Sequence, residues 1–129
     1  MPEPLKHGAV LFAKDLPRMA TFYEQLLSMH LMLRQDDLIL LDGDDFQLVL
    51  HALPAEVAAS VQITLPPQRR ANVPTKLVYP VASLSQARAD APRLGGALDG
   101  PDCEWQGPYF RACDGYDPEG NVLQLREPV

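Results

Sequence analysis

The chain has 129 residues, which is enough for one domain with a sizeable core or for two small modules that share one. Its net charge of -6 argues against nucleic acid or an anionic membrane as a partner, because both need a basic surface. Hydrophobic residues make up 47% and charged residues 22% of the sequence, as in a soluble globular protein, and no apolar run approaches the length of a membrane span.

The N-terminal segment and the cysteines indicate the cellular compartment. Residues 1–6 lack the basic and then apolar pattern of a signal peptide. Cys103 and Cys113 are the two cysteines, and their spacing matches no zinc signature. We therefore expect a cytoplasmic protein with two reduced thiols, in which Cys113 is either a small buried hydrophobe or a reactive group.

The first half of the chain predicts a strand and a helix, followed by three strands. Residues 8–13 are an apolar run of strand type. Asp15 and Pro17 suit the N-cap and the first turn of a helix over residues 17–28. Its apolar side chains recur at helical spacing at Met19, Phe22, Tyr23, Leu26 and Leu27. The strands that complete a β-α-β-β-β order are expected at residues 30–34, 36–41 and 46–51.

A looser, proline-rich segment joins the two halves. Residues 53–59 are expected to hold a short helical turn, and residues 61–65 alternate as a strand does. A linker over residues 67–74 follows.

The second half of the chain repeats this order of elements. Residues 76–81 predict a strand, which Pro80 places at a sheet edge or at a bulge. Ser83 suits the N-cap of a helix that extends to Leu94 and ends at Gly95. The later strands are expected at residues 97–98, 104–105, 109–113 and 122–125.

Residues 117–121 predict a tight turn that leads into the last strand. Gly120 and Asn121 are the residue types that most readily adopt a positive φ. On the strand that follows, alternation puts Val122 and Gln124 on one face and two leucines on the other. Gln124 therefore either contributes to a site or lies on a solvated face.

An internal repeat supports the division into two similar halves. Residues 10–16 align with residues 78–84, and the Asp42-Gly43 hairpin signal aligns with a second Asp-Gly pair at residues 114–115. The identity between the halves is low, so the order of the elements carries the comparison.

Two stretches resemble a known family, the vicinal oxygen chelate superfamily, which contains glyoxalase I, bleomycin-resistance proteins and extradiol dioxygenases. Residues 10–16, with Phe22-Tyr23 and Leu26-Leu27, are similar to its first strand, Asp-Leu turn and helix. Residues 117–125 resemble its closing Asp-Pro-x-Gly-Asn turn and last strand.

This resemblance implies an α+β fold in which two βαβββ modules form a cupped mixed sheet. It places module one at about residues 5–66 and module two at about residues 75–129, within a single domain of residues 1–129. Many members of the superfamily are homodimers, so a homodimer is expected here.

The resemblance also indicates where metal ligands would stand, namely on the first and last strands of each module. In metal-dependent members these ligands are typically His, Glu, His and Glu or Gln. The corresponding positions here are Gly8, Val49 or Gln47, Lys76 and Gln124, of which Gln124 alone matches a ligand type. His7 is next to the first position and would need a bulge to serve. We therefore expect neither a metal ion nor another cofactor.

Several side chains are candidates for a ligand-binding site. Gln47, His51, Lys76 and Gln124 would line the cup if the strand faces are as predicted, although the alternative that His51 and Lys76 lie at the surface is favoured for these two residues. Trp105, with Tyr109 beside it, and Arg111 would suit a flat or anionic ligand, and Trp105 could instead lie in the core or at a dimer interface.

These observations favour a small-molecule-binding protein of the superfamily that lacks the usual metal-ligand set. The alternative is a metal-dependent lyase, isomerase or dioxygenase whose unusual ligands would be His7 or His51 with Gln124 and Glu104. A third interpretation is a partner-binding subunit whose cavity is filled by its own side chains.

Overall fold

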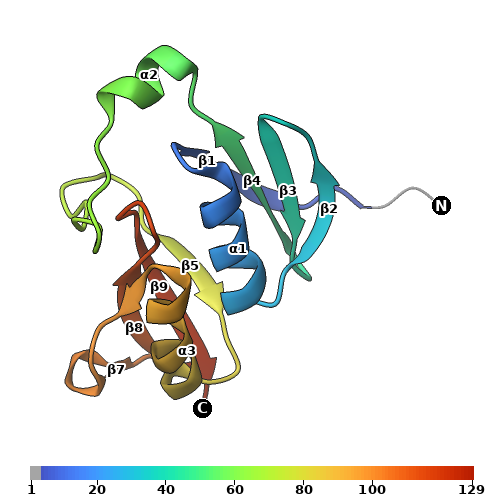
Figure 1. Ribbon diagram of the computed structural model, residues 1–129. Coiled ribbons are helices and arrows are strands. Elements are labelled where there is room, and N and C mark those ends of the chain that lie inside the picture. Colours follow the sequence, from blue (N-terminus) through green and yellow to red (C-terminus); the bar gives the residue numbers. More distant parts are fainter. Residues whose placement is uncertain (1–3) are drawn as a thin grey trace. The chain divides into compact units, whose positions relative to one another are not determined.

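The computed structural model describes residues 4–129 and divides into two compact units. Unit 1 ends at Val61 and unit 2 begins at Gln62. Each unit combines a mixed sheet with helices, so the predicted α+β class is confirmed (Figure 1). Of the helices in the described part of the chain, none is long and apolar enough to cross a membrane.

Unit 1 has the predicted β-α-β-β-β order, followed by a short helix. Its elements are β1 (His7–Ala13), α1 (Leu16–Leu26), β2 (His30–Arg34), β3 (Leu38–Asp42), β4 (Phe46–Ala52) and α2 (Ala55–Ser60). The sheet order is β1-β4-β3-β2, in which β1 runs parallel to β4 and the other neighbours are antiparallel.

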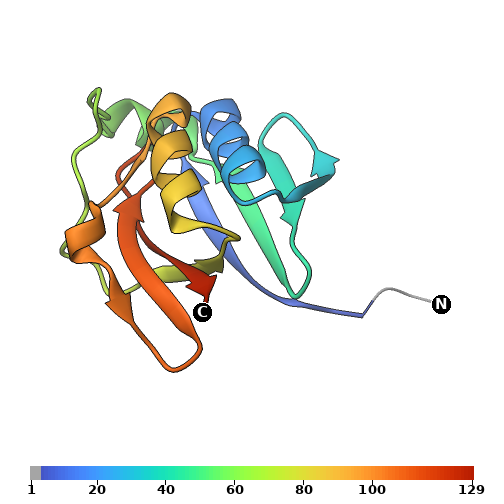
Figure 2. The ribbon, with the colours of Figure 1, turned by 90° about the horizontal axis from the view of Figure 1, so that it is seen from below.

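Helix α1 starts where the sequence predicts and covers one face of the unit 1 sheet (Figure 2). The Asp15 carboxylate accepts a hydrogen bond from the Arg18 backbone N–H at 3.2 Å, which caps the first turn. The buried side chains between the helix and the sheet are Met19, Ala20, Phe22, Tyr23, Ile39, Leu41, Leu48 and Leu50. Because strands alternate, the opposite face carries the neighbouring positions of β3 and β4.

Unit 2 repeats the same order with short additions. Its elements are β5 (Leu77–Pro80), α3 (Leu84–Asp90), the 3-10 helix η1 (Ala91–Leu94), β6 (Ala97–Leu98), η2 (Pro101–Cys103), β7 (Trp105–Gln106), β8 (Phe110–Tyr116) and β9 (Val122–Pro128). The sheet order is β5-β9-β8-β6, and β7 pairs with β8. Strand β5 lies at the edge and ends at Pro80, as expected for a residue without an N–H.

Helix α3 covers one face of the unit 2 sheet, as α1 does in unit 1 (Figure 2). Ser83 caps α3 by accepting a hydrogen bond from the Gln86 backbone N–H at 3.1 Å. Gly95 ends the following turn in the left-handed region with φ of 98°. The core on this side is formed by Tyr79, Leu84, Ala87, Ala91, Leu98, Cys113, Leu123 and Leu125.

The turn between β8 and β9 is held by Asp117, which is fully buried. Its carboxylate accepts hydrogen bonds from the backbone N–H groups of Glu119 and Asn121 at 2.9 and 3.0 Å. Gly120 has the predicted positive φ, at 83°. Asn121 does not, and its side chain donates to Asp117 Oδ2 at 2.9 Å.

Two local predictions were wrong. Residues 61–65 do not form a strand, because no strand within residues 4–129 pairs with them. The Thr64 hydroxyl donates to the Pro66 carbonyl. Asp114 and Gly115 do not form a turn but lie within β8. A Cβ atom at Gly115 would overlap the backbone carbonyl of Ala97, so this glycine permits the close approach of β6.

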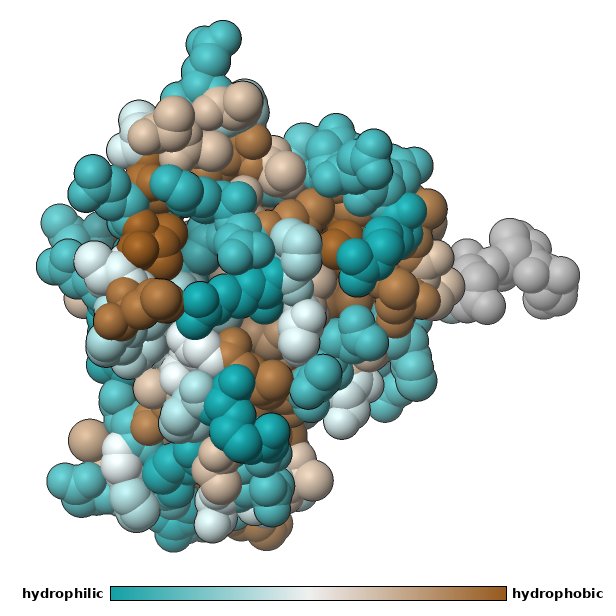
Figure 3. Space-filling model, viewed as in Figure 1, coloured by the Kyte–Doolittle hydropathy of each residue, from teal (hydrophilic) through white to brown (hydrophobic). Residues whose placement is uncertain are grey.

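Apolar side chains remain exposed on unit 1. Val10 and Phe12 on β1 are 53% and 58% exposed. Strand β2 lies at the sheet edge and exposes three consecutive apolar residues, Leu31, Met32 and Leu33. The space-filling view shows hydrophobic patches over the region of β2 and β3 (Figure 3). Neighbouring exposed apolar side chains of this kind often mark an interaction surface.

Candidate functional site

The face of each sheet that lies away from its helix is called its open face here. In unit 2 the open face carries Val122, Gln124 and Arg126 from β9, because these residues alternate with the buried leucines of that strand. Asp114 of β8 is the direct cross-strand partner of Gln124, so both side chains lie on this face.

Gln124 is held at both ends of its side-chain amide. Its Nε2 donates to Asp114 Oδ1 at 3.0 Å, and its Oε1 accepts from Arg126 Nε at 2.8 Å. A carboxylate only accepts and a guanidinium only donates, so these two partners fix the orientation of the amide. Gln124 is only 7% exposed. It therefore forms part of an ordered polar network and does not lie on a solvated face.

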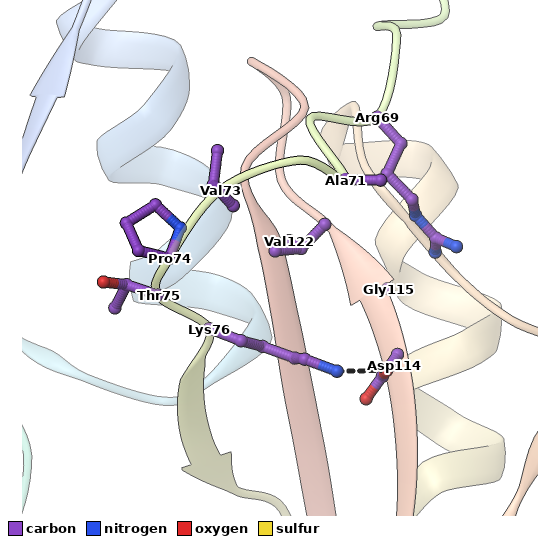
Figure 4. A pocket seen from close by; sticks show the side chains of 9 residues that line it. All are labelled: Arg69, Ala71, Val73, Pro74, Thr75, Lys76, Asp114, Gly115 and Val122. Carbon is purple, nitrogen blue, oxygen red and sulfur yellow. Dashed lines mark hydrogen bonds and ion pairs between the residues drawn. The ribbon is translucent and has the colours of Figure 1, made fainter.

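Lys76 extends this network across the sheet. It precedes β5 and reaches over β9, so that its Nζ lies 2.6 Å from Asp114 Oδ2 (Figure 4). Burial raises the pKa of Asp114, but the hydrogen bonds from Lys76 and Gln124 outweigh it and hold that pKa below its ordinary value. Asp114 is therefore an anion that fixes both neighbouring side chains.

An aromatic group adjoins the network on the same face. The Arg126 guanidinium carbon lies 4.0 Å from the centre of the Phe110 ring, a cation–π contact. Phe110 and Trp105 pack edge to face with their ring centres 5.5 Å apart, and Trp105 is 46% exposed. This part of the open face thus offers an aromatic surface beside a positive charge.

Arg111 is not brought to the open face. Because Arg111 and Asp114 are an odd number of positions apart on β8, their side chains lie on opposite faces of the sheet. On the helix side, the Arg111 guanidinium contacts Gln106 and Glu104 at 3.5 and 3.9 Å. Arg126 supplies the guanidinium that the sequence analysis assigned to Arg111. Extending the alternation of β9 by two residues beyond Gln124 would have found it.

A pocket of about 360 Å³ adjoins the network at the end of the sheet. The linker forms one wall and strands β8 and β9 form the other (Figure 4). The residues that line it are Arg69, Ala71, Val73, Pro74, Thr75, Lys76, Asp114, Gly115 and Val122. Sequence reasoning placed only Lys76 of these at a site, because the path of the linker carries no local pattern.

In unit 1, Gln47 and His51 share the open face of β4. Gln47 Nε2 donates to Asp42 Oδ1 at 3.1 Å, and Asp42 accepts from Lys6 Nζ at 2.9 Å. His51 lies at the other end of the strand, with its ring centre 5.8 Å from that of Phe12 and its Nδ1 2.8 Å from the Ala52 carbonyl oxygen. Gln47 is thus part of a polar cluster, and His51 is part of an apolar one.

The strand register shows which residues stand beside the two glutamines. Gly8 is the neighbour of Gln47, and Val78 is the neighbour of Gln124. The sequence alignment had placed Lys76 where Val78 stands, because Gly8 lies eight residues before the start of α1 whereas Val78 lies six residues before the start of α3. Neither glycine nor valine has a side-chain atom that could bind a metal.

The alternative metal ligands are not assembled within either unit. His7 alternates with Gly8 on β1 and therefore lies on the face opposite to Gln47 and His51. Glu104 is bound to Arg88 at 2.5 Å on the helix side of unit 2, whereas Gln124 lies on the open face. Within residues 4–129, no group of three or more His, Cys, Asp or Glu side chains could hold a metal ion.

Comparisons with known proteins place this fold. No family model matches the sequence, and no curated protein matches it. A solved glyoxalase/bleomycin resistance protein/dioxygenase family enzyme from Burkholderia phytofirmans is 17% identical with a TM-score of 0.70, covering 95% of this chain and 97% of that one. The fosfomycin resistance protein FosX from Listeria monocytogenes is 15% identical with a TM-score of 0.67, covering 100% and 94%.

A third solved structure, the antibiotic-binding protein TnmS3 from a Streptomyces species, is 22% identical with a TM-score of 0.62, covering 100% of this chain and 99% of that one. At these identities the likeness establishes the fold. The chain has the glyoxalase/bleomycin-resistance-like fold that its motifs predicted.

Proposed function

We propose that the chain is a small-molecule-binding protein that works without a metal ion and binds its ligand on the open face of unit 2. The observation that carries this proposal is that both ends of the Gln124 side-chain amide are hydrogen-bonded within the protein. Its amide oxygen accepts from Arg126 at 2.8 Å while its amide nitrogen donates to Asp114 at 3.0 Å.

This arrangement does not fit a divalent metal. A metal ion at Gln124 would need the lone pairs of Oε1, and it would then lie against the positive guanidinium of Arg126. Val78, the residue beside Gln124, has no donor atom, and Gly8 beside Gln47 has none either. We therefore derive no metal-dependent step for this site.

The chemistry of the open face indicates the kind of ligand. Trp105 and Phe110 offer an aromatic surface, and Arg126 lies beside it as a cation. Such a surface suits a planar molecule that carries an anionic or carbonyl group, because the ring stacks and the guanidinium donates. One structural neighbour is an antibiotic-binding protein, which is compatible with binding of a small molecule on this fold.

Trp105 makes this proposal testable, because it is the one tryptophan of the sequence. We would titrate the protein with the dye anilinonaphthalene sulfonate, a planar aromatic anion, and follow energy transfer from Trp105. Saturable binding is expected with and without EDTA. Arg126→Met should weaken it about tenfold, since a charged contact is lost. Arg93→Met is the matched control, because Arg93 is exposed and pairs with Asp90.

Two results would overturn the metal-free function, and a third would overturn the assignment of the site. One is stoichiometric metal in the purified protein by elemental analysis. The other is dye binding that appears only after Ni, Mn or Fe(II) is added. Either result would favour the metal-dependent enzyme, and an assay of lyase or dioxygenase activity would follow. If neither Arg126→Met nor Arg93→Met changes the affinity for the dye, the ligand binds elsewhere on the protein.

We also expect a homodimer in the cytoplasm. The exposed edge strand β2, with Leu31, Met32 and Leu33, is the surface that a second copy would cover, because apolar edge strands readily pair. Sedimentation analysis should give twice the mass of the chain, and Met32→Lys should give a monomer. A monomeric parent protein would contradict this expectation.

A further inference from the structure

The same three polar side chains meet in both units. Lys6, Asp42 and Gln47 form the first set, and Lys76 with Asp114 and Gln124 forms the second. In each set the lysine precedes the first strand and reaches over the last strand to an aspartate. The aspartate is the direct cross-strand partner of the glutamine in both units. The two triads therefore occupy equivalent places in the repeated fold.

The two lysines differ in how many of their N–H groups are used. Lys6 Nζ donates to both Asp42 oxygens at 3.1 and 2.9 Å and to the Gly43 carbonyl at 3.0 Å. Its side chain is only 17% exposed. Lys76 Nζ donates to Asp114 alone among the described residues, and its side chain is 42% exposed. An ammonium has three donors, so Lys76 retains two.

Lys76, which keeps two unused N–H donors, lines the pocket. Lys76 and Arg69 both line it, and the remaining lining residues include Ala71, Val73 and Val122 (Figure 4). Arg69 forms two hydrogen bonds to Asp99 at 2.7 and 3.3 Å and lies over the Tyr116 ring. Arg69 Nε is buried and has no hydrogen-bond partner among residues 4–129. Lys76 is thus the cation of this pocket that keeps exposed, unused donors, and it lies beside an apolar wall.

We propose that this pocket binds the carboxylate of a ligand with an apolar body, and that Lys76 donates directly to that carboxylate. The proposal rests on the proposed small-molecule-binding function and names the part of the ligand held at this end of the open face. Asp114 holds the ammonium in place through one N–H, and the carboxylate accepts from the others. The apolar body packs against Val73 and Val122.

Benzoate and benzamide are the probes for this proposal, because they share one body and differ in charge. Benzoate should bind with a dissociation constant on the order of 1 mM by NMR titration, as expected for a ligand of this size, and benzamide at least tenfold more weakly. Lys76→Met should weaken benzoate about tenfold or more, whereas Lys76→Arg should retain most of the affinity. Lys6→Met is the matched control and should leave benzoate binding unchanged.

A double variant distinguishes a direct contact between Lys76 and the ligand carboxylate from an effect of Lys76 that only neutralises Asp114. In Asp114→Asn, Lys76 is released from its ion pair and benzoate should bind several-fold more tightly. Adding Lys76→Met to Asp114→Asn removes the pair without a change in net charge. If Lys76 contacts the carboxylate, this double variant should bind as weakly as Lys76→Met. Recovery of parental affinity in the double variant would overturn the proposal, because Lys76 would then act only through Asp114.

Other outcomes also decide the question. Equal binding of benzoate and benzamide, no saturable benzoate binding, or an equal effect of Lys6→Met would each overturn the carboxylate site. Tighter binding of inorganic phosphate than of benzoate would overturn the proposal that the ligand has an apolar body. A different result would contradict the proposed metal-free function, namely dye or benzoate binding that requires a metal. That result does not depend on the effect of Lys76→Met.

Discussion

Asp42 and Asp114 occupy equivalent positions in the two units. Each lies directly across from a glutamine of the last strand and accepts its side-chain N–H, at 3.1 Å in unit 1 and 3.0 Å in unit 2. Each also pairs with the lysine that precedes the first strand. A carboxylate that ties three strands together in both units stabilises the sheet as long as it is ionised.

The first prediction is therefore a loss of stability in acid. The hydrogen bonds from Lys6 and Gln47 hold the pKa of Asp42 below its ordinary value. Asp114 is shifted in the same direction. Because the folded-state pKa values lie below the unfolded ones, the stabilisation is complete above the unfolded pKa of about 4 and is lost as the pH falls through the folded values.

Urea unfolding at a series of pH values between about 7 and 2.5 would measure this effect. Asp42→Asn and Asp114→Asn should each be less stable than the parent protein near neutral pH, with a smaller further loss in acid. Asp45→Asn, at an exposed position of the hairpin, is the control and should follow the parent curve. Parallel curves for all four proteins would contradict the prediction.

The second prediction concerns Asp117, which is fully buried in the turn between β8 and β9. Asp117→Ala leaves two backbone N–H groups without their acceptor, those of Glu119 and Asn121. We expect a loss of about 2 kcal/mol or more in the free energy of unfolding, since unsatisfied buried donors are costly. Asp102→Ala, at an exposed position of η2, should cost far less.

The elements that could be predicted from the sequence are those set by neighbours along the chain. Asp15 and Ser83 cap their helices as expected, because an N-cap bonds within one turn. The faces of β9 also followed from alternation, with Leu123 and Leu125 buried and Gln124 opposite. Such features need no knowledge of which segments meet in space.

The parts of the site that depend on distant partners could not be predicted. Asp114 was assigned to a turn because an Asp-Gly pair is a turn signal, yet it lies within β8 and pairs with Lys76. Arg126 follows from the alternation of β9, but the face on which Arg111 lies depends on the register of β8 with β9. The role of Arg69 depends on the path of a linker that has no periodic pattern.

The third prediction compares two glycines with positive φ. Gly120 has φ of 83°, and a Cβ atom there would overlap the Gln68 carbonyl oxygen. Gly95 has φ of 98° at the end of η1. Gly95→Ala should cost about 1 kcal/mol for the backbone conformation alone, whereas Gly120→Ala should cost clearly more because the linker must also move.

Thermal and urea unfolding of both alanine variants would measure this difference. Gly120→Ala should also weaken benzoate binding, since the Arg70 backbone N–H donates to the Gly120 carbonyl at 2.8 Å and helps to position the linker. Gly95→Ala should leave benzoate binding unchanged. An equal loss of unfolding free energy in the two variants would contradict this prediction, because the linker would then move away at Gln68 without a measurable energetic cost.

The last prediction concerns the two thiols, which differ in accessibility. Cys103 is exposed, whereas Cys113 is fully buried, with its Sγ 3.3 Å from the Asp99 carbonyl oxygen and 3.7 Å from Arg88 Nη2. Burial raises the pKa of the Cys113 thiol and outweighs the opposite effect of Arg88. Only a thiolate reacts with a disulfide reagent, so burial and a raised pKa act in the same direction.

We therefore expect one fast thiol in the folded protein and a second that reacts only on unfolding. Titration with Ellman's reagent near pH 8 should show one equivalent at once and two in urea. Cys103→Ser should remove the fast reaction, and Cys113→Ser should leave it intact. Rapid labelling of Cys113 in the folded Cys103→Ser variant would contradict the prediction. It would show that the sheet opens at β8 on the timescale of the reaction, and the polar network of Asp114 would then be mobile as well.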